Sequence, residues 1–279
     1  MIHNIKRRKF IELIGYGCCG LILPSCSTVP ITNRRQLSIY PEGAINNSAA
    51  NAYENFKTKN KLITSGDQLE SIKKIGQRIE FAVKSFFLKQ DGKDPTSSFQ
   101  WDYILVDNDK VKNAWCMPGG KIAIYTGILK VTQNDNALAA VMGHEIAHAV
   151  AKHSVERASQ ALTVNIGTQV ADIFLGGAIN RTRQTIGQSS GMDILQLGIF
   201  NPFGRKQETE ADYLGLIFSS LAGYDIRESI KLWERMAEDK KGKEPPQFMS
   251  THPSSANRII NLNKWITEVM IEYPPIKRV

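Results

Sequence analysis

The stretch His144-Glu145-Ile146-Ala147-His148 reads H-E-x-x-H, and no other five residues of the chain say as much about chemistry. Side chains four positions apart on an α-helix differ by about 40° around its axis, so His144 and His148 would lie on one face. Both rings could then reach one Zn²⁺, and Glu145, about 100° round the helix, could take a proton from a water beside the metal. The spacing therefore predicts a helix over about 134–152 that carries half of a zinc site.

The alternative to a zinc site is a chance match. The chain has five His, so an accidental H-E-x-x-H should occur on the order of once in a hundred such sequences. The residues around the motif are mostly small and apolar, which is typical of a helix buried on most sides. Two His and one Glu are costly to bury without a partner, and a metal ion is the natural partner.

A third ligand is predicted in residues 205–215, where E-x-x-A-D precedes an apolar run and again indicates a helix. Glu208 and Asp212 are four apart and share a face, so Glu208 can bind the metal while Asp212 accepts the free ring N–H of a ligand His. Glu210 should point elsewhere. An ordinary acidic first turn, favoured by the helix dipole, is the alternative. The upstream motif favours the ligand interpretation, with one Zn²⁺ per chain and an open fourth position.

With both motifs intact, the chain resembles the HtpX-like and CAAX-prenyl-protease-type zinc metallopeptidases, which are gluzincins. The resemblance covers roughly residues 34–270. It implies that His144, His148 and Glu208 bind zinc, that Glu145 is the catalytic base and that Asp212 supports a ligand. The implied fold class is α+β and mostly helical, a minigluzincin-like domain with a small β-sheet beside the catalytic helix.

Two further stretches carry the resemblance. Residues 113–127 resemble the strand and turn that precede the catalytic helix, and Thr251-His252-Pro253 with Arg258 resembles a C-terminal T-H-P…R segment. The resemblance places His252 near the zinc, as an oxyanion donor or as a ligand in an inactive form. A structural His in a turn before Pro253 is an equal alternative. Arg258 either orients substrate or anchors the last helix.

A peptide substrate must lie extended across the metal, and an edge strand can hold it by backbone pairing. The candidate edge consists of Asn113, Ala114, Trp115, Cys116 and Met117. Such pairing tolerates many sequences, so the expected substrates are loosened or unfolded proteins. Cys116 itself is expected to be a small packed residue.

His153 follows His148 by five positions, about 140° round the helix, so it cannot join the same metal. A surface or second-layer position is expected for it.

Residues 1–25 have the pattern of an export signal. A basic run precedes an apolar run over 13–23 that is too short to cross a hydrocarbon core of ~30 Å. Residues 7–11 resemble a twin-arginine signal, and residues 23–26 resemble a lipobox ending in Cys26. We therefore expect a periplasmic lipoprotein that is anchored at Cys26 in the outer membrane, because Ser27 follows the cysteine. A plain cleaved signal with an unmodified Cys26 is the alternative.

Removal of residues 1–25, which hold four basic residues and one acid, lowers the formal net charge from +8 to +5. That charge needs no nucleic-acid partner. Cys18 and Cys19 leave with the signal, and Cys26 would be acylated. Only Cys116 then remains free, so no intramolecular disulfide is expected.

Three segments are predicted: the export signal 1–25, an extended tether 26–45, and one metallopeptidase domain over 46–279. Within that domain the patterns predict helices over 46–64, 67–89, 134–152, 154–175, from about 205 to 221, 225–240 and 254–270, and strands over 101–106, 113–117 and 121–125. The polar residues 178–190 are either a lid beside the site or an inert insertion.

The predicted function is that of a zinc metalloendopeptidase of the cell envelope, which hydrolyses misfolded or unassembled envelope proteins. The alternative is a latched or inactive peptidase fold that acts as a chaperone or assembly factor for outer-membrane proteins. The intact Glu145 favours the peptidase, because a pure binding module need not keep the base.

Overall fold

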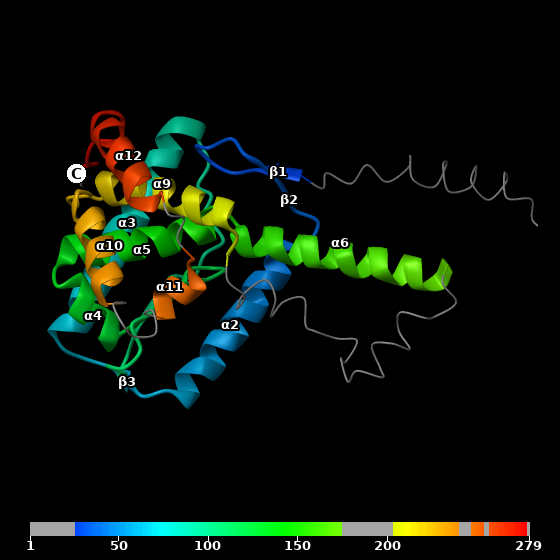
Figure 1. Ribbon diagram of the computed structural model, residues 1–279, viewed down its shortest axis with the longest axis horizontal. Coiled ribbons are helices and arrows are strands. Elements are labelled where there is room, and N and C mark those ends of the chain that lie inside the picture. Colours follow the sequence, from blue (N-terminus) through cyan, green and yellow to red (C-terminus); the bar gives the residue numbers. More distant parts are fainter. Residues whose placement is uncertain (1–25, 175–202, 240–246, 254–256, 278–279) are drawn as a thin grey trace, which may run out of the picture.

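The computed structural model describes residues 26–174, 203–239, 247–253 and 257–277, and the side chains of residues 164–174 lie outside this description. The elements follow one another (Figure 1) as β1 (Cys26–Thr28), β2 (Arg35–Leu37), α2 (Glu42–Lys59), β3 (Leu62–Ile63), α3 (Asp67–Asp91), β4 (Asp102–Val106), β5 (Ala114–Met117), β6 (Lys121–Tyr125), α4 (Thr126–Thr132), α5 (Asp135–Val150), α6 (His153–Phe174), α9 (Arg205–Leu221), α10 (Glu228–Asp239), α11 (Gln247–Thr251) and α12 (Arg258–Glu272).

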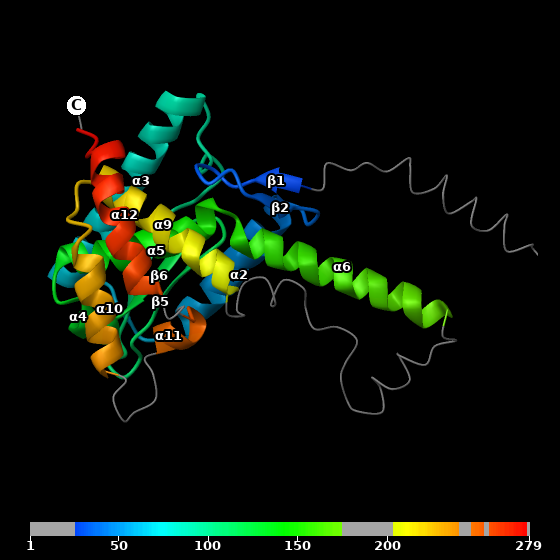
Figure 2. The ribbon, with the colours of Figure 1, turned by 45° about the horizontal axis from the view of Figure 1, so that its top comes forward.

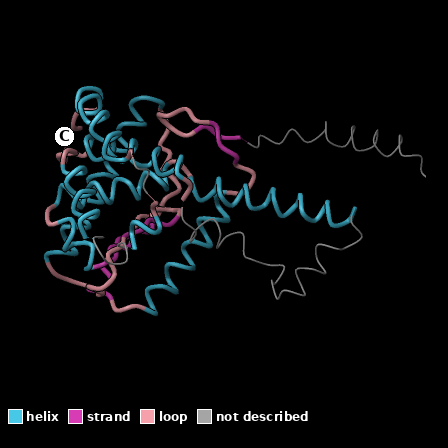
Figure 3. Tube along the Cα trace, in the orientation of Figure 1, coloured by secondary structure: helices cyan, strands magenta, loops and turns pink. Residues whose placement is uncertain are grey.

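A four-stranded sheet in the order β3-β4-β6-β5 lies among the helices (Figure 3). β4 and β6 are parallel, whereas β3 and β5 are antiparallel to their neighbours. Because β5 is last in the strand order, it is an edge strand. Side chains alternate between the two faces: Tyr103 and Leu105 of β4 pack with α3 and α5, and Ile104 and Val106 pack with α2. Because helices cover both faces, the strands are almost entirely apolar.

Helix α5 runs through the centre of the molecule and contacts α3, α9, α10 and β5. Its first turn is capped by the Asn134 side chain, which accepts a hydrogen bond from the Ala137 N–H at 2.9 Å. From Ala137 onward every residue of α5 except Ala140 is buried. The small, apolar sequence around H-E-x-x-H therefore reflects a helix surrounded by other elements, as predicted.

Two glycines let α9 cross α5 closely. A Cβ on Gly143 of α5 would lie 2.8 Å from the Gly215 carbonyl oxygen, and a Cβ on Gly215 of α9 would lie 2.9 Å from the His144 backbone nitrogen. Glu208 and Asp212 share the face of α9 that carries Gly215. The close crossing therefore brings both carboxylates against the two His of α5.

The mostly helical fold with a small sheet agrees with the predicted α+β class, and the likeness to a minigluzincin stays a prediction. The predicted helices and strands are present, with ends that differ by a few residues. α2 begins at Glu42 rather than at residue 46. None of the helices in the described ranges is long and apolar enough to cross a membrane. Residues 1–25 and 178–190 lie outside the described residues.

The expected tether over 26–45 differs most from the structure. Residues 26–37 form an antiparallel hairpin of β1 and β2, which lies along the start of α6 (Figure 2). Val29 is fully buried, and the backbone N–H groups of Ile39 and Tyr40 both donate to Ser159 Oγ at 3.0 Å. Pro30 lies in the turn between the two strands, and Pro41 is the N-cap residue of α2.

Candidate metal centre

Four buried side chains converge where α5, α9 and the segment after α11 meet. His144 and His148 come from α5, Glu208 from the first turn of α9, and His252 from the residue after α11. One ligand atom of each lies within 4.8 Å of all the others, and each residue is at most 4% exposed. Buried polar groups this close need a shared partner, and a metal ion is the partner that suits two or three imidazoles and a carboxylate.

The separations fit a tetrahedral ion. Ligand atoms about 2.0–2.1 Å from Zn²⁺ at tetrahedral angles lie roughly 3.3 Å from one another. The Nε2 atoms of His144 and His148 are 3.1 Å apart, and they lie 3.5 and 3.4 Å from the Glu208 carboxylate. His252 Nδ1 lies 3.1 Å from Glu208 Oε1 and 3.3 Å from His144 Nε2. The donor set therefore fits zinc, with His252 at the fourth corner.

The electrostatics suit a cation at this point. Burial raises the pKa of Glu208, but hydrogen bonds with His144, His148 and His252 outweigh burial and hold that pKa well below its ordinary range. Burial lowers the pKa of His148, which keeps it a neutral imidazole. Burial also lowers the pKa of His144, but Asp212 and Glu208 together raise it to about 10. The cluster thus attracts positive charge, which a metal ion would supply in place of a proton.

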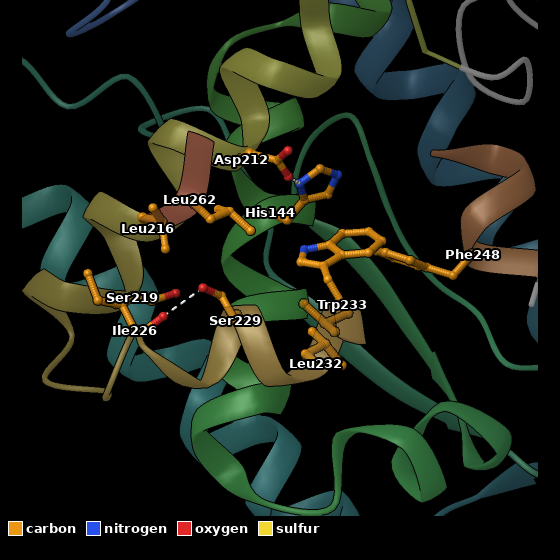
Figure 4. A pocket seen from close by; sticks show the side chains of 13 residues that line it. His144, Asp212, Leu216, Ser219, Ile226, Ser229, Leu232, Trp233, Phe248 and Leu262 are labelled. Carbon is orange, nitrogen blue, oxygen red and sulfur yellow. Dashed lines mark hydrogen bonds and ion pairs between the residues drawn. The ribbon is translucent and has the colours of Figure 1, made fainter. Parts of the chain in front are cut away.

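Asp212 and Arg258 orient the His144 side of the cluster. Asp212 Oδ1 lies 3.0 Å from His144 Nδ1, and Figure 4 shows the carboxylate beside the ring, in a cavity also lined by Trp233. Arg258 donates from Nε to Asp212 at 2.6 Å and from Nη2 to Glu208 at 2.8 Å. Its guanidinium lies 4.0 Å from the centroid of the Trp233 ring. Arg258 therefore ties α12 to α9, as the anchor alternative expected, and it also holds the Glu208 carboxylate and the Asp212 carboxylate behind His144.

Glu145 lies between the cluster and the edge strand. Its Oε1 is 3.2 Å from His252 Nε2, and its Oε2 accepts from the Cys116 N–H at 3.2 Å. Burial raises the pKa of Glu145 above its ordinary value, against the opposing effect of His252 and His144. A carboxylate with a raised pKa suits a group that accepts a proton and returns it.

A cavity of about 250 Å³ opens in front of Glu145 and His252. Its walls include Trp115 and Met117 of β5 and Phe56 of α2, with the Phe56 and Trp115 rings edge to face at 5.0 Å. Asn113, the first residue of the predicted edge, also lines the cavity but precedes β5, which begins at Ala114. The predicted strand therefore borders the cavity and the base.

Cys116 is a buried free thiol, as expected of a small packed residue. Its backbone N–H donates to Glu145 Oε2, and its sulfur lies 3.5 Å from the Met117 carbonyl oxygen. Burial raises the pKa of the thiol well above its ordinary value, which disfavours the reactive thiolate.

Several residues of the site belong to no sequence motif, and Phe203 and Arg157 could not be predicted from the sequence. Phe203 stacks on His148 with ring centroids 3.8 Å apart, and the Arg157 guanidinium lies 3.9 Å from the centroid of the Phe203 ring. His153 is fully buried, its Nδ1 lies 2.8 Å from His148 Nδ1 and its Nε2 lies 2.9 Å from Glu210. His153 is thus the second-layer residue that its spacing allowed, and Glu210 points away from the metal but toward His153.

The chain is similar in sequence to several known metallopeptidases. The profile of Peptidase family M48 matches residues 73–266. The mitochondrial metalloendopeptidase OMA1 of Schizosaccharomyces pombe is 37% identical over 180 residues, which are 63% of this chain and 50% of that protein. OMA1 of Saccharomyces cerevisiae is 30% identical over 279 residues, which are 93% of this chain and 74% of that protein. The putative beta-barrel assembly-enhancing protease of Vibrio cholerae is 28% identical over 61% of this chain and 34% of that protein.

These relatives contradict the predicted localisation. The sequence predicts a periplasmic, membrane-anchored lipoprotein, but the two OMA1 relatives are named as mitochondrial. Neither the HtpX-like type nor the expected periplasmic lipoprotein type is confirmed by these relatives. The physical reason is that a basic run before a short apolar run does not specify one compartment. Cys26 is the exposed first residue of β1, and its lipidation stays a prediction.

Proposed function

This chain belongs to peptidase family M48, which makes it a zinc metalloendopeptidase, and from this premise we propose that its substrates are misfolded or unassembled proteins. His144, His148 and Glu208 would hold the zinc ion, and Glu145 would act as the base. The name of the bacterial relatives, beta-barrel assembly-enhancing protease, supports unassembled proteins as substrates. The single observation that carries the proposal is the position of Glu145, which faces both the cluster and the edge strand β5.

The chain's own residues would divide the chemistry among them. When bound, Zn²⁺ would lower the pKa of a water molecule toward neutrality and polarise the substrate carbonyl. Glu145 would accept the proton of the attacking water and return it to the leaving amine. The outer edge of β5 would hold the peptide extended by backbone pairing, with side chains entering the aromatic cavity at Trp115 and Phe56. Recognition through the backbone favours loosened chains, because a folded protein keeps its strands paired.

The variant Glu145→Gln tests the proposal. It should lower the rate of cleavage of an unfolded casein substrate by about 10²–10⁴-fold, because a glutamine cannot accept the proton. Zinc content measured by atomic absorption should stay at that of the wild type, since Glu145 is not among the ligands. Glu70→Gln is the matched control, because it makes the same chemical change at a surface side chain that is 66% exposed. The proposal would be overturned if Glu145→Gln cleaved casein at the wild-type rate. It would also be overturned if the zinc-bound wild-type protein cleaved no unfolded substrate.

The fourth corner of the tetrahedron favours a second candidate, a latched form of the same peptidase. His252 Nδ1 stands where a substrate carbonyl or water would need to enter, while its Nε2 engages Glu145. Under this candidate His252→Ala frees both the fourth position and the base, so cleavage of casein should rise several-fold with zinc still bound. A fall in the rate would instead assign His252 to stabilisation of the oxyanion.

A further inference from the structure

We propose that Arg34 of the N-terminal hairpin is a positioning residue for the metal centre, acting on His148 through Glu210 and His153. The inference rests on the proposed role of His148 as a zinc ligand. It assigns to residues 26–37, expected to be a passive tether, a direct effect on how the chain holds its metal.

The four side chains form a continuous chain of contacts. Arg34 Nε donates to Glu210 Oε2 at 2.8 Å, and the same oxygen lies 2.9 Å from His153 Nε2. His153 Nδ1 lies 2.8 Å from His148 Nδ1. Three of the four are nearly inaccessible to water, since the side chain of Glu210 is 6% exposed and those of His153 and His148 at most 1%. Arg34, 28% exposed, is the member at the surface.

One set of donors satisfies every contact in the chain. If His148 presents Nε2 to the metal, its Nδ1 carries the hydrogen and donates to His153 Nδ1. His153 then carries its hydrogen on Nε2 and donates to Glu210. Glu210 Oε2 must therefore be an acceptor at this point, and it also accepts from Arg34 Nε.

Arg34 is built into this position by more than one contact. Its Nη1 and Nη2 donate to the two oxygens of Glu156 at 2.8 and 2.9 Å, a bidentate pair with a carboxylate that is 8% exposed. Gln207 donates to the same Glu156 at 2.8 Å. The guanidinium thus lies between two buried carboxylates, one from α6 and one from α9. Without it, both would keep uncompensated negative charge in a place poorly reached by water.

The turn that presents Arg34 is strained, as backbone segments at functional sites often are. Ile31 has φ +68° and Asn33 has φ +53°, both in the left-handed region, and a β-branched residue rarely adopts it. Between them Thr32 hydrogen-bonds through Oγ1 to Glu210. The strained turn therefore places two contacts, from Thr32 and Arg34, on one carboxylate, which is hard to explain if the hairpin only covers the surface.

Zinc affinity, measured by competition with a chromophoric chelator on the full chain, tests the inference. Loss of a partner behind a ligand His typically weakens metal binding about 10–100-fold. We expect Arg34→Ala to raise the Kd for Zn²⁺ about tenfold and to shift the visible absorption bands of the Co²⁺-substituted protein. Arg34→Lys should recover part of the affinity, since an ammonium group can still donate to Glu210. Arg35→Ala is the matched control, because Arg35 is the exposed neighbour on the same hairpin and should bind zinc as the wild type does.

Different failures are distinguishable. Wild-type affinity and an unchanged Co²⁺ spectrum in Arg34→Ala would overturn the inference while the zinc site stands. If circular dichroism shows that Arg34→Ala does not fold without metal, the milder variant Glu210→Gln is tested instead. A zinc affinity and a Co²⁺ spectrum equal to those of the wild type in that variant would also overturn the inference. His148→Ala that keeps wild-type affinity would overturn the proposed ligand set, and the role of Arg34 with it.

Discussion

Asp212 illustrates how much of this site depends on single side chains that do not touch the metal position. Its Oδ1 lies 3.0 Å from His144 Nδ1, and its Oδ2 accepts a hydrogen bond from Arg258 Nε at 2.6 Å. It therefore orients the His144 ring and also holds Arg258, which donates to Glu208. The helical spacing of Glu208 and Asp212 predicted the first contact. The second required α12 to pack beside α9, which no local pattern indicates.

We expect Asp212→Ala to weaken zinc binding about 10–100-fold, because His144 would lose the acceptor that orients its ring. Chelator competition at fixed pH measures the change. Asp109→Ala is a suitable control, since Asp109 also pairs with a cation, Lys130 at 2.7 Å, but is 59% exposed. Equal affinities for the Asp212→Ala protein and the wild type would show that the ring is held by packing alone.

At the next scale, the crossing of α5 and α9 sets the distance between the two halves of the site. Gly215 faces the backbone of His144, and neither helix can retreat without moving a ligand. The tight contact is backbone against backbone, so no flexible side chain can absorb an added methyl group.

Gly215→Ala should therefore destabilise the protein by about 1–3 kcal/mol, the usual range for an overpacked core, and should weaken zinc binding as well. Urea unfolding of the metal-free protein measures the first effect. Gly43→Ala provides a control of opposite sign: Gly43 lies in α2 with nothing within 4 Å of an added Cβ, so alanine there should stabilise by about 0.5–1 kcal/mol. A Gly215→Ala protein as stable as the wild type would mean that the helices can slide apart freely.

The elements show which features local patterns predict and which they cannot. Helices α3, α5, α9 and the strands β4 to β6 follow from apolar spacing and from turn residues such as Gly92, the left-handed C-cap of α3. The sequence predicts a linker where the hairpin of β1 and β2 lies, because these strands have three residues each and their side chains alternate weakly. Short strands of this kind are specified by what they dock on, here α6 and Glu210, rather than by their own sequence.

For the molecule as a whole, the metal should act as part of the fold. The candidate ligands His144, His148 and Glu208 come from α5 and α9 and converge only in the native state, so zinc should bind the folded chain in preference to the unfolded one. At a free zinc concentration of about 100 times the Kd, the added stability is about 2.7 kcal/mol.

Removal of zinc by a chelator should therefore lower the melting temperature, and added zinc should restore it. Differential scanning calorimetry with and without chelator measures the shift. His148→Ala should show little response to either treatment. A wild-type melting temperature that does not depend on zinc would indicate that the ion contributes nothing to the native state at that concentration.

The candidate ligands could be predicted from the sequence because His144 and His148 are four positions apart on one helix, and Glu208 and Asp212 are four apart on another, where spacing fixes geometry. The groups behind them could not. Arg34 and Glu210 are 176 positions apart, and Arg258 and Glu208 are 50 apart. Such pairs depend on tertiary packing, so only the structure shows that both flanks of the domain reach the same centre.

The contacts of Arg34 and Arg258 also bear on the order in which the site can be completed. During synthesis the chain emerges from its N-terminus, and His144 and His148 are made long before Glu208, His252 and Arg258. A growing chain that ends before α12 has both imidazoles but lacks Arg258, which holds the Glu208 carboxylate. Its hairpin can make the contact with Glu210 only after α9 has been made. The ability to cut proteins would therefore arise only after α12 has been made, so a shorter, still unfolded chain could not cleave itself or its neighbours.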